Sequence, residues 1–175
     1  ISMPPPIPVI AINNIVGLTV NDPAYTLANT DLGTTDGNNT AAELTYTLNS
    51  QPSGGTLKKS GVALNNGETF TQDDIDNSLM TFEEGGVETD PGGFDFTVRD
   101  PALNSESGTF VIRVIQAISV SADTASSDED TVASESQLSA GANLLSNDTG
   151  NSLKVTTFDA VSTNGAAVSV NPDGT

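Results

Sequence analysis

The stretch that most constrains the fold is Gly93–Asp100, which reads Gly-Phe-Asp-Phe-Thr-Val-Arg-Asp. Phe94, Phe96 and Val98 alternate with polar side chains, which is the period-2 pattern of a strand with one buried face and one face in water. Two of the six phenylalanines in the chain lie here. The pattern therefore indicates a β protein whose hydrophobic core forms around this segment.

Other segments share this strand character. Alternating or β-branched residues predict further strands at Ile10–Val20, Ala24–Leu32, Leu44–Leu48, Leu79–Phe82 and Gly108–Ile118. The Asn-Asn-Gly sequence at 65–67 predicts a hairpin turn. One turn of helix is expected at Phe70–Ile75, because Thr71 and Asp74 can form a capping box and the two end residues a hydrophobic staple. We expect no long helix, and the fold class is all-β.

The sequence divides into three parts. Four prolines lie within Ile1–Pro8, which favours an extended linker over residues 1–13. Residues 14–116 carry the strands described above and predict one β domain. At 117–175 the pattern restarts, with strands expected at Val155–Phe158 and Ala167–Val170, but no strand follows the turn at Asn171–Gly174. We interpret this second domain as incomplete, and a strand donated by another copy could cover its free edges.

Composition excludes several function classes. There are 23 acidic against 5 basic residues, a formal charge of −18, which argues against binding to nucleic acid or to anionic membranes. The chain has no cysteine and no histidine, so disulfides, Ser-His-Asp triads and the usual zinc sites are excluded. The apolar runs are too short or too interrupted to span a bilayer. Paired carboxylates could serve a glycoside hydrolase, but pairs are inevitable in so acidic a chain, so we expect no enzyme.

Three stretches resemble the CSPG repeat, a repeat named for chondroitin sulfate proteoglycans and common in bacterial surface proteins. They are Thr35–Leu48, Gly67–Asp76 and Asp90–Asp100, and their order and spacing cover about residues 14–116. The resemblance implies a cadherin-like β-sandwich of about seven strands. Family members commonly carry a His-Asp-Gly-Ser-like loop before the core strand, and here that loop reads Glu-Glu-Gly-Gly at 83–86.

The second part resembles the start of a bacterial cadherin-like tandem repeat of the kind found in VCBS and RTX adhesin arrays. The matching stretches are Asp128–Thr131, Leu144–Thr149 and Asn171–Thr175. That family usually places an Asp-rich loop after Asn-Asp-Thr, whereas this chain has Gly-Asn-Ser at 150–152. Both resemblances imply a long, secreted, multi-repeat protein of a bacterial surface, with neighbouring repeats of the same chain as its partners.

Calcium is the cofactor that the polar loops favour. Asp36, Asn38 and Asn39 have the spacing of a cadherin-type pair of oxygen ligands, although the same residues also favour a turn without metal. Glu88, Asp90 and Asp100 are further candidate ligands, which we expect to approach the same end of the sandwich. For each of these acids the alternative is a solvated surface.

Four more acids lie just past the domain junction and complete the set of candidate ligands: Asp123, Asp128, Glu129 and Asp130. In cadherin-like arrays such acids hold calcium between domains, so the resemblance implies a junction that calcium stiffens. The alternative is an acidic linker that binds no metal.

Two function classes stay open. The first is a structural or adhesive repeat module of a secreted or cell-surface protein, and the second is a carbohydrate-binding module. Exposed aromatic side chains would favour polysaccharide as a partner, and the candidates are Tyr25, Tyr46 and Phe158. Tyr46 alternates with leucines in a predicted core strand, and the chain has no tryptophan. The structural module is therefore the preferred interpretation.

Overall fold

The computed structural model describes residues 6–123, 143–150, 153–161, 165 and 167–175. It divides the chain into two compact units, Ile1–Ile115 and Gln116–Thr175. The elements of the first unit are, in order, β1 (Val9–Asn13), β2 (Val16–Thr19), β3 (Tyr25–Thr26), β4 (Leu32–Thr35), η1 (Ala41–Glu43), β5 (Thr45–Leu48), β6 (Gly55–Lys59), β7 (Val62–Ala63), β8 (Thr69–Thr71), α1 (Gln72–Asp76), β9 (Met80–Glu84), β10 (Thr89–Arg99) and β11 (Ser105–Ile115).

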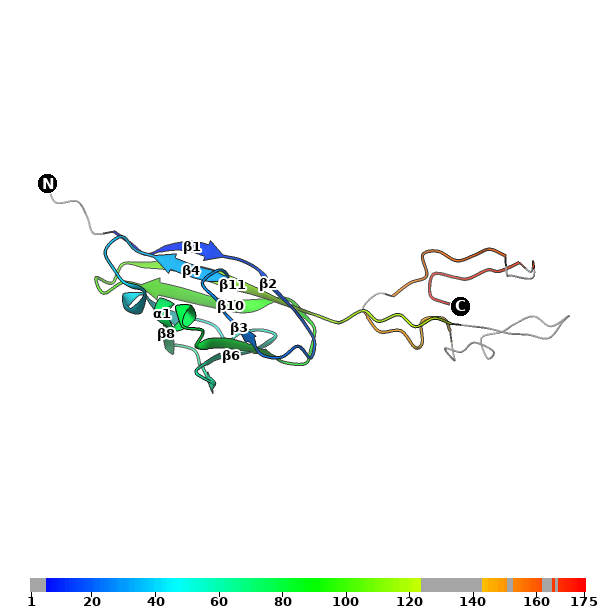
Figure 1. The fold of residues 1–175 in the computed structure, drawn as a ribbon, viewed down its shortest axis with the longest axis horizontal. Coiled ribbons are helices and arrows are strands. Elements are labelled where there is room, and N and C mark those ends of the chain that lie inside the picture. The colour runs from blue at the N-terminus through cyan, green and yellow to red at the C-terminus, as the bar shows by residue number, and fades with distance from the viewer. Residues whose placement is uncertain (1–5, 124–142, 151–152, 162–164, 166) are drawn as a thin grey trace. The chain divides into compact units, whose positions relative to one another are not determined.

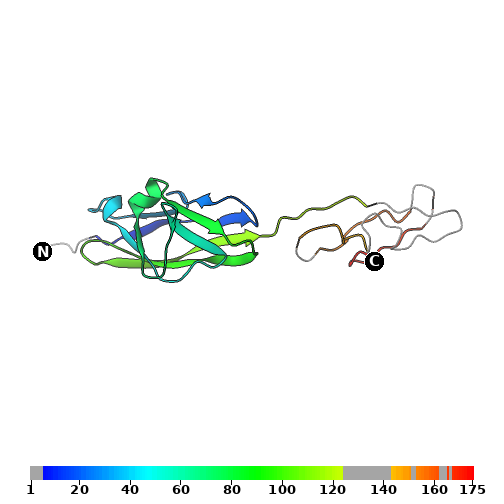
Figure 2. The same ribbon diagram turned by 90° about the horizontal axis from the view of Figure 1, so that it is seen from below.

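The first unit is a β-sandwich, which confirms the predicted fold class. One sheet has the order β2-β11-β10-β5-β8 and the other has the order β3-β9-β6-β7, while β1 and β4 form a separate pair. Figures 1 and 2 show these strands as two layers, with α1 beside one end. Side chains from both layers meet in one core, including Phe96 and Phe110 from the larger sheet and Leu57 and Phe82 from the smaller.

The predicted core strand is the centre of this sandwich. It extends over Thr89–Arg99 as β10 and pairs with β11 on one side and β5 on the other. Phe94, Phe96 and Val98 are fully buried, as the alternation predicts. Each such side chain stabilises the fold by about 1.5–3 kcal/mol through the apolar surface that it removes from water.

The strand predicted at Ile10–Val20 is split in two. The Asn14 backbone N donates to Asp31 O (2.8 Å) and its side-chain amide donates to Thr30 O (2.8 Å). These bonds turn the chain, so that β1 pairs antiparallel with β4 and β2 pairs parallel with β11. Because β1 pairs with β4, residues 9–13 belong to the folded unit, although they lie in the range predicted as a linker.

The strand predicted at Ala24–Leu32 is also interrupted. The Asp31 carboxylate accepts hydrogen bonds from the Tyr25 hydroxyl and from the Ala28 backbone N, both at 2.9 Å. Leu32 N donates back to Ala28 O (3.2 Å). This turn separates β3, which pairs with β9, from β4, which pairs with β1.

The hairpin predicted at Asn65–Gly67 is wrong. Gly67 does lie in a turn with a positive φ of 84°, but the segment carries the chain from β7 in one sheet to β8 in the other. The two-residue hairpin of this region is Ser60-Gly61, between β6 and β7. Both residues have a positive φ (49° and 80°), which is the geometry of a type I′ turn.

The short helix is confirmed. α1 covers Gln72–Asp76, and the Thr71 hydroxyl accepts from Asp74 N (3.1 Å) while the Asp74 carboxylate accepts from Thr71 N (2.7 Å). The sequence did not predict η1, which Glu43 caps by accepting from Thr40 N (2.8 Å). No helix in the described part of the chain is long and apolar enough to cross a membrane.

The second unit has little regular structure in its described residues. Its pairing there consists of two isolated bridges, Ser119 with Thr149 and Val161 with Ala167. The segment predicted as a strand at Val155–Phe158 is irregular, although Val155 N donates to Pro172 O (2.9 Å). At Ala167–Val170 only the first residue forms a bridge, so neither predicted strand is present.

Candidate functional site

The three predicted calcium ligands around β10 do not all come together. Asp90 lies near the start of this strand and Asp100 directly follows its end. At about 3.3 Å per residue the two carboxylates are roughly 30 Å apart. The expectation that Glu88, Asp90 and Asp100 approach the same end of the sandwich is therefore wrong for Asp100, because one long strand separates it from Glu88 and Asp90.

The carboxylates of Asp100 and Asp90 have partners within the protein. Asp100 is 4% exposed, and its two oxygens accept from the backbone N and the side-chain amide of Asn104, each at 2.8 Å. It thereby closes the turn between β10 and β11. Asp90 Oδ1 lies 3.2 Å from Arg113 Nε at the opposite end. These contacts give both carboxylates a structural role.

The loop at Asp36–Asn39 lies at the end of the sandwich that Asp100 occupies, because it leads through η1 to Thr45, which pairs with Arg99. Asp36 Oδ1 accepts from Asn38 N (3.0 Å), which is the turn that the alternative interpretation predicts. Asp36 Oδ2, however, is buried without a hydrogen-bond partner, unlike every other side-chain N or O atom buried in the described residues. A buried carboxylate oxygen without a partner is costly, so this atom favours a bound cation or water.

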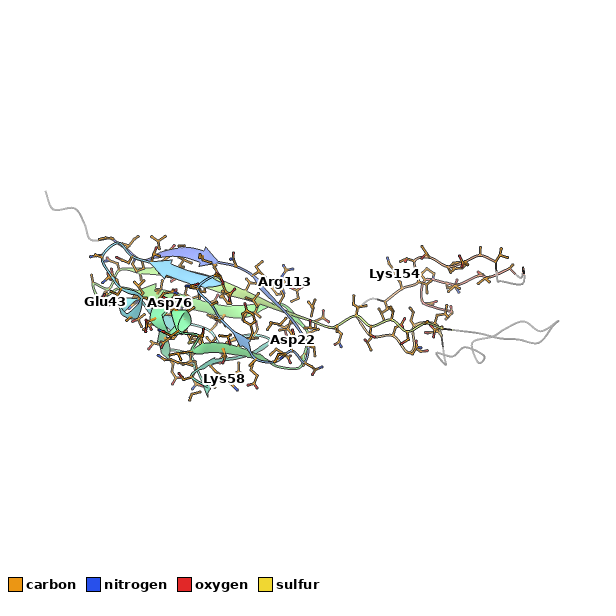
Figure 3. All side chains as sticks on the ribbon, viewed as in Figure 1. Asp22, Glu43, Lys58, Asp76, Arg113 and Lys154 are labelled. Atoms are coloured by element: carbon orange, nitrogen blue, oxygen red, sulfur yellow. The ribbon has the colours of Figure 1, made fainter. Side chains whose placement is uncertain are left out.

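A cavity of about 430 Å³ adjoins this loop, between β1, β4, η1 and α1. Its walls include Asp36, Asn39 and Asp76, whereas Asn38 lies outside it. Asp76 is exposed at the end of α1, and one of its oxygens accepts from Gln72 Nε2 (2.9 Å). Figure 3 shows Asp76 and Glu43 toward the same end of the unit, and Asp22 and Arg113 toward the other.

Asn39 lines this cavity and also contacts Glu43. Hydrogen bonds from Thr40 and, more weakly, from the Asn39 side chain hold the pKa of the Glu43 carboxyl below its ordinary value. The Asn39 amide nitrogen is the donor of that bond. Its side chain therefore contacts Glu43 while the residue lines the cavity.

A buried hydrogen-bond network adjoins the cavity, which Thr34 and Gln72 line. The Tyr46 hydroxyl lies 2.7 Å from Gln72 Oε1 and 2.5 Å from Thr34 Oγ1, and Thr34 N donates to Gln72 Oε1 (2.8 Å). Burial raises the pKa of the Tyr46 hydroxyl well above its ordinary value, so it stays a neutral donor. These bonds fix β4, β5 and α1 to one another and hold the walls of the cavity in place.

The side chains that line the cavity include oxygen ligands of the types that a hard cation takes. Asp36 and Asp76 supply carboxylate oxygens and Asn39 an amide oxygen, which are the ligand types that calcium prefers. In the part of the chain that the structure describes, no three acidic side chains gather to hold a metal. Backbone carbonyls and water would therefore complete the six to eight ligands that calcium takes.

Sequence reasoning missed Asp76. It lies 40 residues beyond Asp36 in the sequence and reaches the cavity only because α1 packs beside β4. The acidic run at 73–76 was a visible signal, but nothing local connects it to the Asp36 loop.

The remaining candidates lie in the second unit. Asp123 Oδ1 accepts from the Asn147 side-chain amide (3.0 Å). Asp128, Glu129 and Asp130 lie outside the described residues.

The three candidate aromatics do not form a platform for sugars. Tyr46 is buried in the core, and Tyr25 is half-buried with its hydroxyl bonded to Asp31. Phe158, in the second unit, is 47% exposed. Among the described residues, therefore, none of the geometry favours a carbohydrate-binding module.

Comparison with known proteins identifies one family. A family model described as Cadherin-like matches residues 8–114, which is more than half of the chain and contains every strand of the first unit but the last residue of β11. No curated protein matches the chain.

Proposed function

The chain belongs to the Cadherin-like family, and from this premise we propose that it is an adhesive or structural repeat module of a large bacterial surface protein. The family match over residues 8–114 is the observation that carries the proposal. Cadherin-like domains are generally structural or adhesive modules rather than enzymes, and they are typical of extracellular proteins. The partners would be neighbouring repeats of the same chain, with strand addition from another copy at the second unit.

The acidic composition supports an extracellular setting with abundant divalent cations. A formal charge of −18 keeps such a module soluble and attracts counter-ions to its surface. Calcium is the proposed ligand, and Asp36, Asn39 and Asp76 are the residues that would hold it. The partnerless Asp36 Oδ2 supports this assignment, because a cation would satisfy a buried oxygen that the protein leaves unpaired.

The consequence of calcium binding is a stiffer first unit. A cation held by the Asp36 loop and by α1 would connect β4 to the helix, and it would reduce the repulsion between the two carboxylates. Extracellular modules of this kind bind calcium at roughly 10⁻⁴–10⁻³ M. With a dissociation constant of about 1 mM, 10 mM calcium would stabilise the native state by about 1.4 kcal/mol.

Thermal unfolding of the full chain in 10 mM calcium or in chelator tests this prediction. We expect calcium to raise the melting temperature by about 5 °C, and Asp36→Asn or Asp76→Asn to abolish most of that rise. Asp73→Asn is the matched control, since Asp73 is an exposed carboxylate of the same helix that does not line the cavity. An equal rise in melting temperature for the unsubstituted chain and the three variants would mean that Asp36 and Asp76 are solvated surface acids that bind no calcium.

A further inference from the structure

The order of the strands places the entry and exit of the first unit side by side. β2 pairs in parallel with the last strand, β11, from Val16 opposite Ile112 to Thr19 opposite Ile115. Val20 N extends this ladder by donating to Ile115 O (2.9 Å). The strand by which the chain enters the larger sheet is therefore bonded to the strand by which it leaves.

Parallel pairing determines how this ladder responds to tension. Pulling on the two ends of the unit draws β2 toward its N-terminus and β11 toward its C-terminus, in opposite directions along one axis. All the hydrogen bonds of the ladder are then loaded at the same time, instead of breaking one after another. We infer that the β2–β11 pair is a force-bearing clamp that resists extension of the module along its chain.

Burial strengthens the clamp. Val16 and Leu18 are each only 6% exposed and pack in the core, so β2 cannot slide without drawing both side chains out of it. The outer edge of β2 is closed in part, because Thr19 N donates to Asp22 Oδ2 (2.7 Å). Sliding β2 therefore exposes apolar surface and breaks the ladder in the same movement.

β1 forms a second attachment nearer the N-terminus. It pairs with β4, and two side-chain bonds connect it to β11: Ile10 N donates to Glu106 Oε2 (2.9 Å) and the Asn13 amide donates to Thr109 O (3.0 Å). The Asn14 crossover then anchors the chain before β2 begins. Under tension β1 is loaded first, and the β2–β11 ladder bears the load once β1 has detached.

This inference concerns resistance to force, and it holds whether or not the module binds calcium. It goes beyond the proposed role because a spacer needs only length, whereas a clamp gives the unit a preferred direction of strength. Force spectroscopy in chelator isolates it from the calcium proposal.

Single-molecule pulling in two directions tests the clamp on the full chain. The sequence has no cysteine, so paired cysteine handles can be placed at will. Handles at Ile7 and Ile115, which are 55% and 47% exposed, load the ladder lengthwise. Handles at Ala24 and Ile115 open the β2–β11 ladder from one end. Ala24 follows the C-terminal end of β2, where Thr19 lies opposite Ile115.

The lengthwise pair should unfold at roughly twice the force of the other pair, or more, because several rungs must fail together. That event should release roughly 360 Å of chain, at the extended length of about 3.3–3.6 Å per residue, which identifies it as unfolding of the first unit. Equal forces in the two directions would overturn the inference.

Proline substitutions test the ladder itself under the lengthwise pull. Val20→Pro removes the N–H that bonds to Ile115 O and should lower the unfolding force. Gly17→Pro is the matched control. Successive backbone N–H groups of a strand point to opposite sides, so the Gly17 N–H points away from β11, as that of Thr19 does. A Cβ at Gly17 also meets no atom within 4 Å. The same force for both variants would contradict the clamp, and if Val20→Pro does not fold, the comparison of pulling directions decides alone.

Discussion

Asp74 of α1 connects its helix to β8, through Thr71, and to β6, through Lys59. Its carboxylate accepts from Thr71 N (2.7 Å) and the Thr71 hydroxyl (3.0 Å) at the start of α1, and from Lys59 Nζ (2.6 Å) on β6. The capping box was predictable because Thr71 and Asp74 are three residues apart in the sequence. The lysine was not predictable, because it comes from a strand of the smaller sheet that only the folded chain brings to the helix.

These bonds make stability depend on pH. Burial alone would raise the pKa of the Asp74 carboxyl, but the hydrogen bonds from Lys59 and Thr71 outweigh it and hold the pKa below its ordinary value. A depressed pKa in the folded state gives stability that is present above the unfolded value of about 3.9 and is lost as the pH falls through the folded value.

Asp74→Asn should therefore cost about 1.5–3 kcal/mol in the free energy of unfolding at pH 7, the usual worth of hydrogen bonds to a charged group. The difference from the unsubstituted chain should begin to shrink as the pH falls below about 4, because the unfolded chain then binds a proton at Asp74. It should disappear once the pH has fallen through the lower pKa of the folded state, where the native carboxylate is protonated too. Urea unfolding at a series of pH values measures both effects. Asp73→Asn, an exposed neighbour, is the control, and a cost as large for that variant would remove the special role of Asp74.

At the scale of the element, the strands show how much of the secondary structure the alternation of apolar and polar residues predicts. Alternation located β5, β10 and β11, because in these strands the burial of every second side chain is fixed by the sequence itself. It did not reveal the breaks at Asn14 and Asp31. The break at Asn14 depends on a side-chain bond to the Thr30 carbonyl of another turn, and the break at Asp31 on a bond from Ala28 N to the Asp31 carboxylate within the same turn. These bonds override a sequence that would otherwise continue as a strand.

Gly93 offers a test of how tightly β10 and β11 pair. Its φ is 133°, and a Cβ there would clash with the Phe110 carbonyl oxygen. Gly93→Ala should therefore cost about 2–4 kcal/mol, since both the backbone conformation and the close approach of β11 require glycine.

Gly17→Ala is the control for this prediction, because a Cβ at that position of β2 meets open space. It should be neutral, or stabilise by about 0.4–1 kcal/mol through the entropy of the unfolded chain. Thermal or urea unfolding compares the two variants, and a similar stability for both would show that the β10–β11 pairing tolerates a side chain at 93.

At the scale of the whole molecule, the sequence predicted the sandwich but not which acids meet. The length of β10 separates Asp90 from Asp100, and the packing of α1 beside β4 brings Asp76 to the cavity that Asp36 lines. Both outcomes depend on distances along and between elements that no local pattern contains. Composition set the charge of the surface, and topology decided which acids line a common cavity.

The same topology predicts where a protease cuts first. Trypsin has five sites in the chain, and the four in the first unit lie inside paired strands, at Lys58, Lys59, Arg99 and Arg113. Cleavage there requires the strand to leave its sheet, which needs an opening that approaches global unfolding. Lys154 lies in the second unit, exposed and outside any strand.

Trypsin should therefore cut the native chain after Lys154 first and leave residues 1–154 as the early product. With an unfolding free energy of about 5 kcal/mol, the sites in strands should be cut at least on the order of 10³-fold more slowly than the Lys154 site. Intact-mass spectra over a time course measure this order, and the chain unfolded in urea provides the control in which all five sites are cut. Early fragments ending at Arg99 or Arg113 would mean that β10 and β11 open far more easily than their pairing and their buried side chains imply.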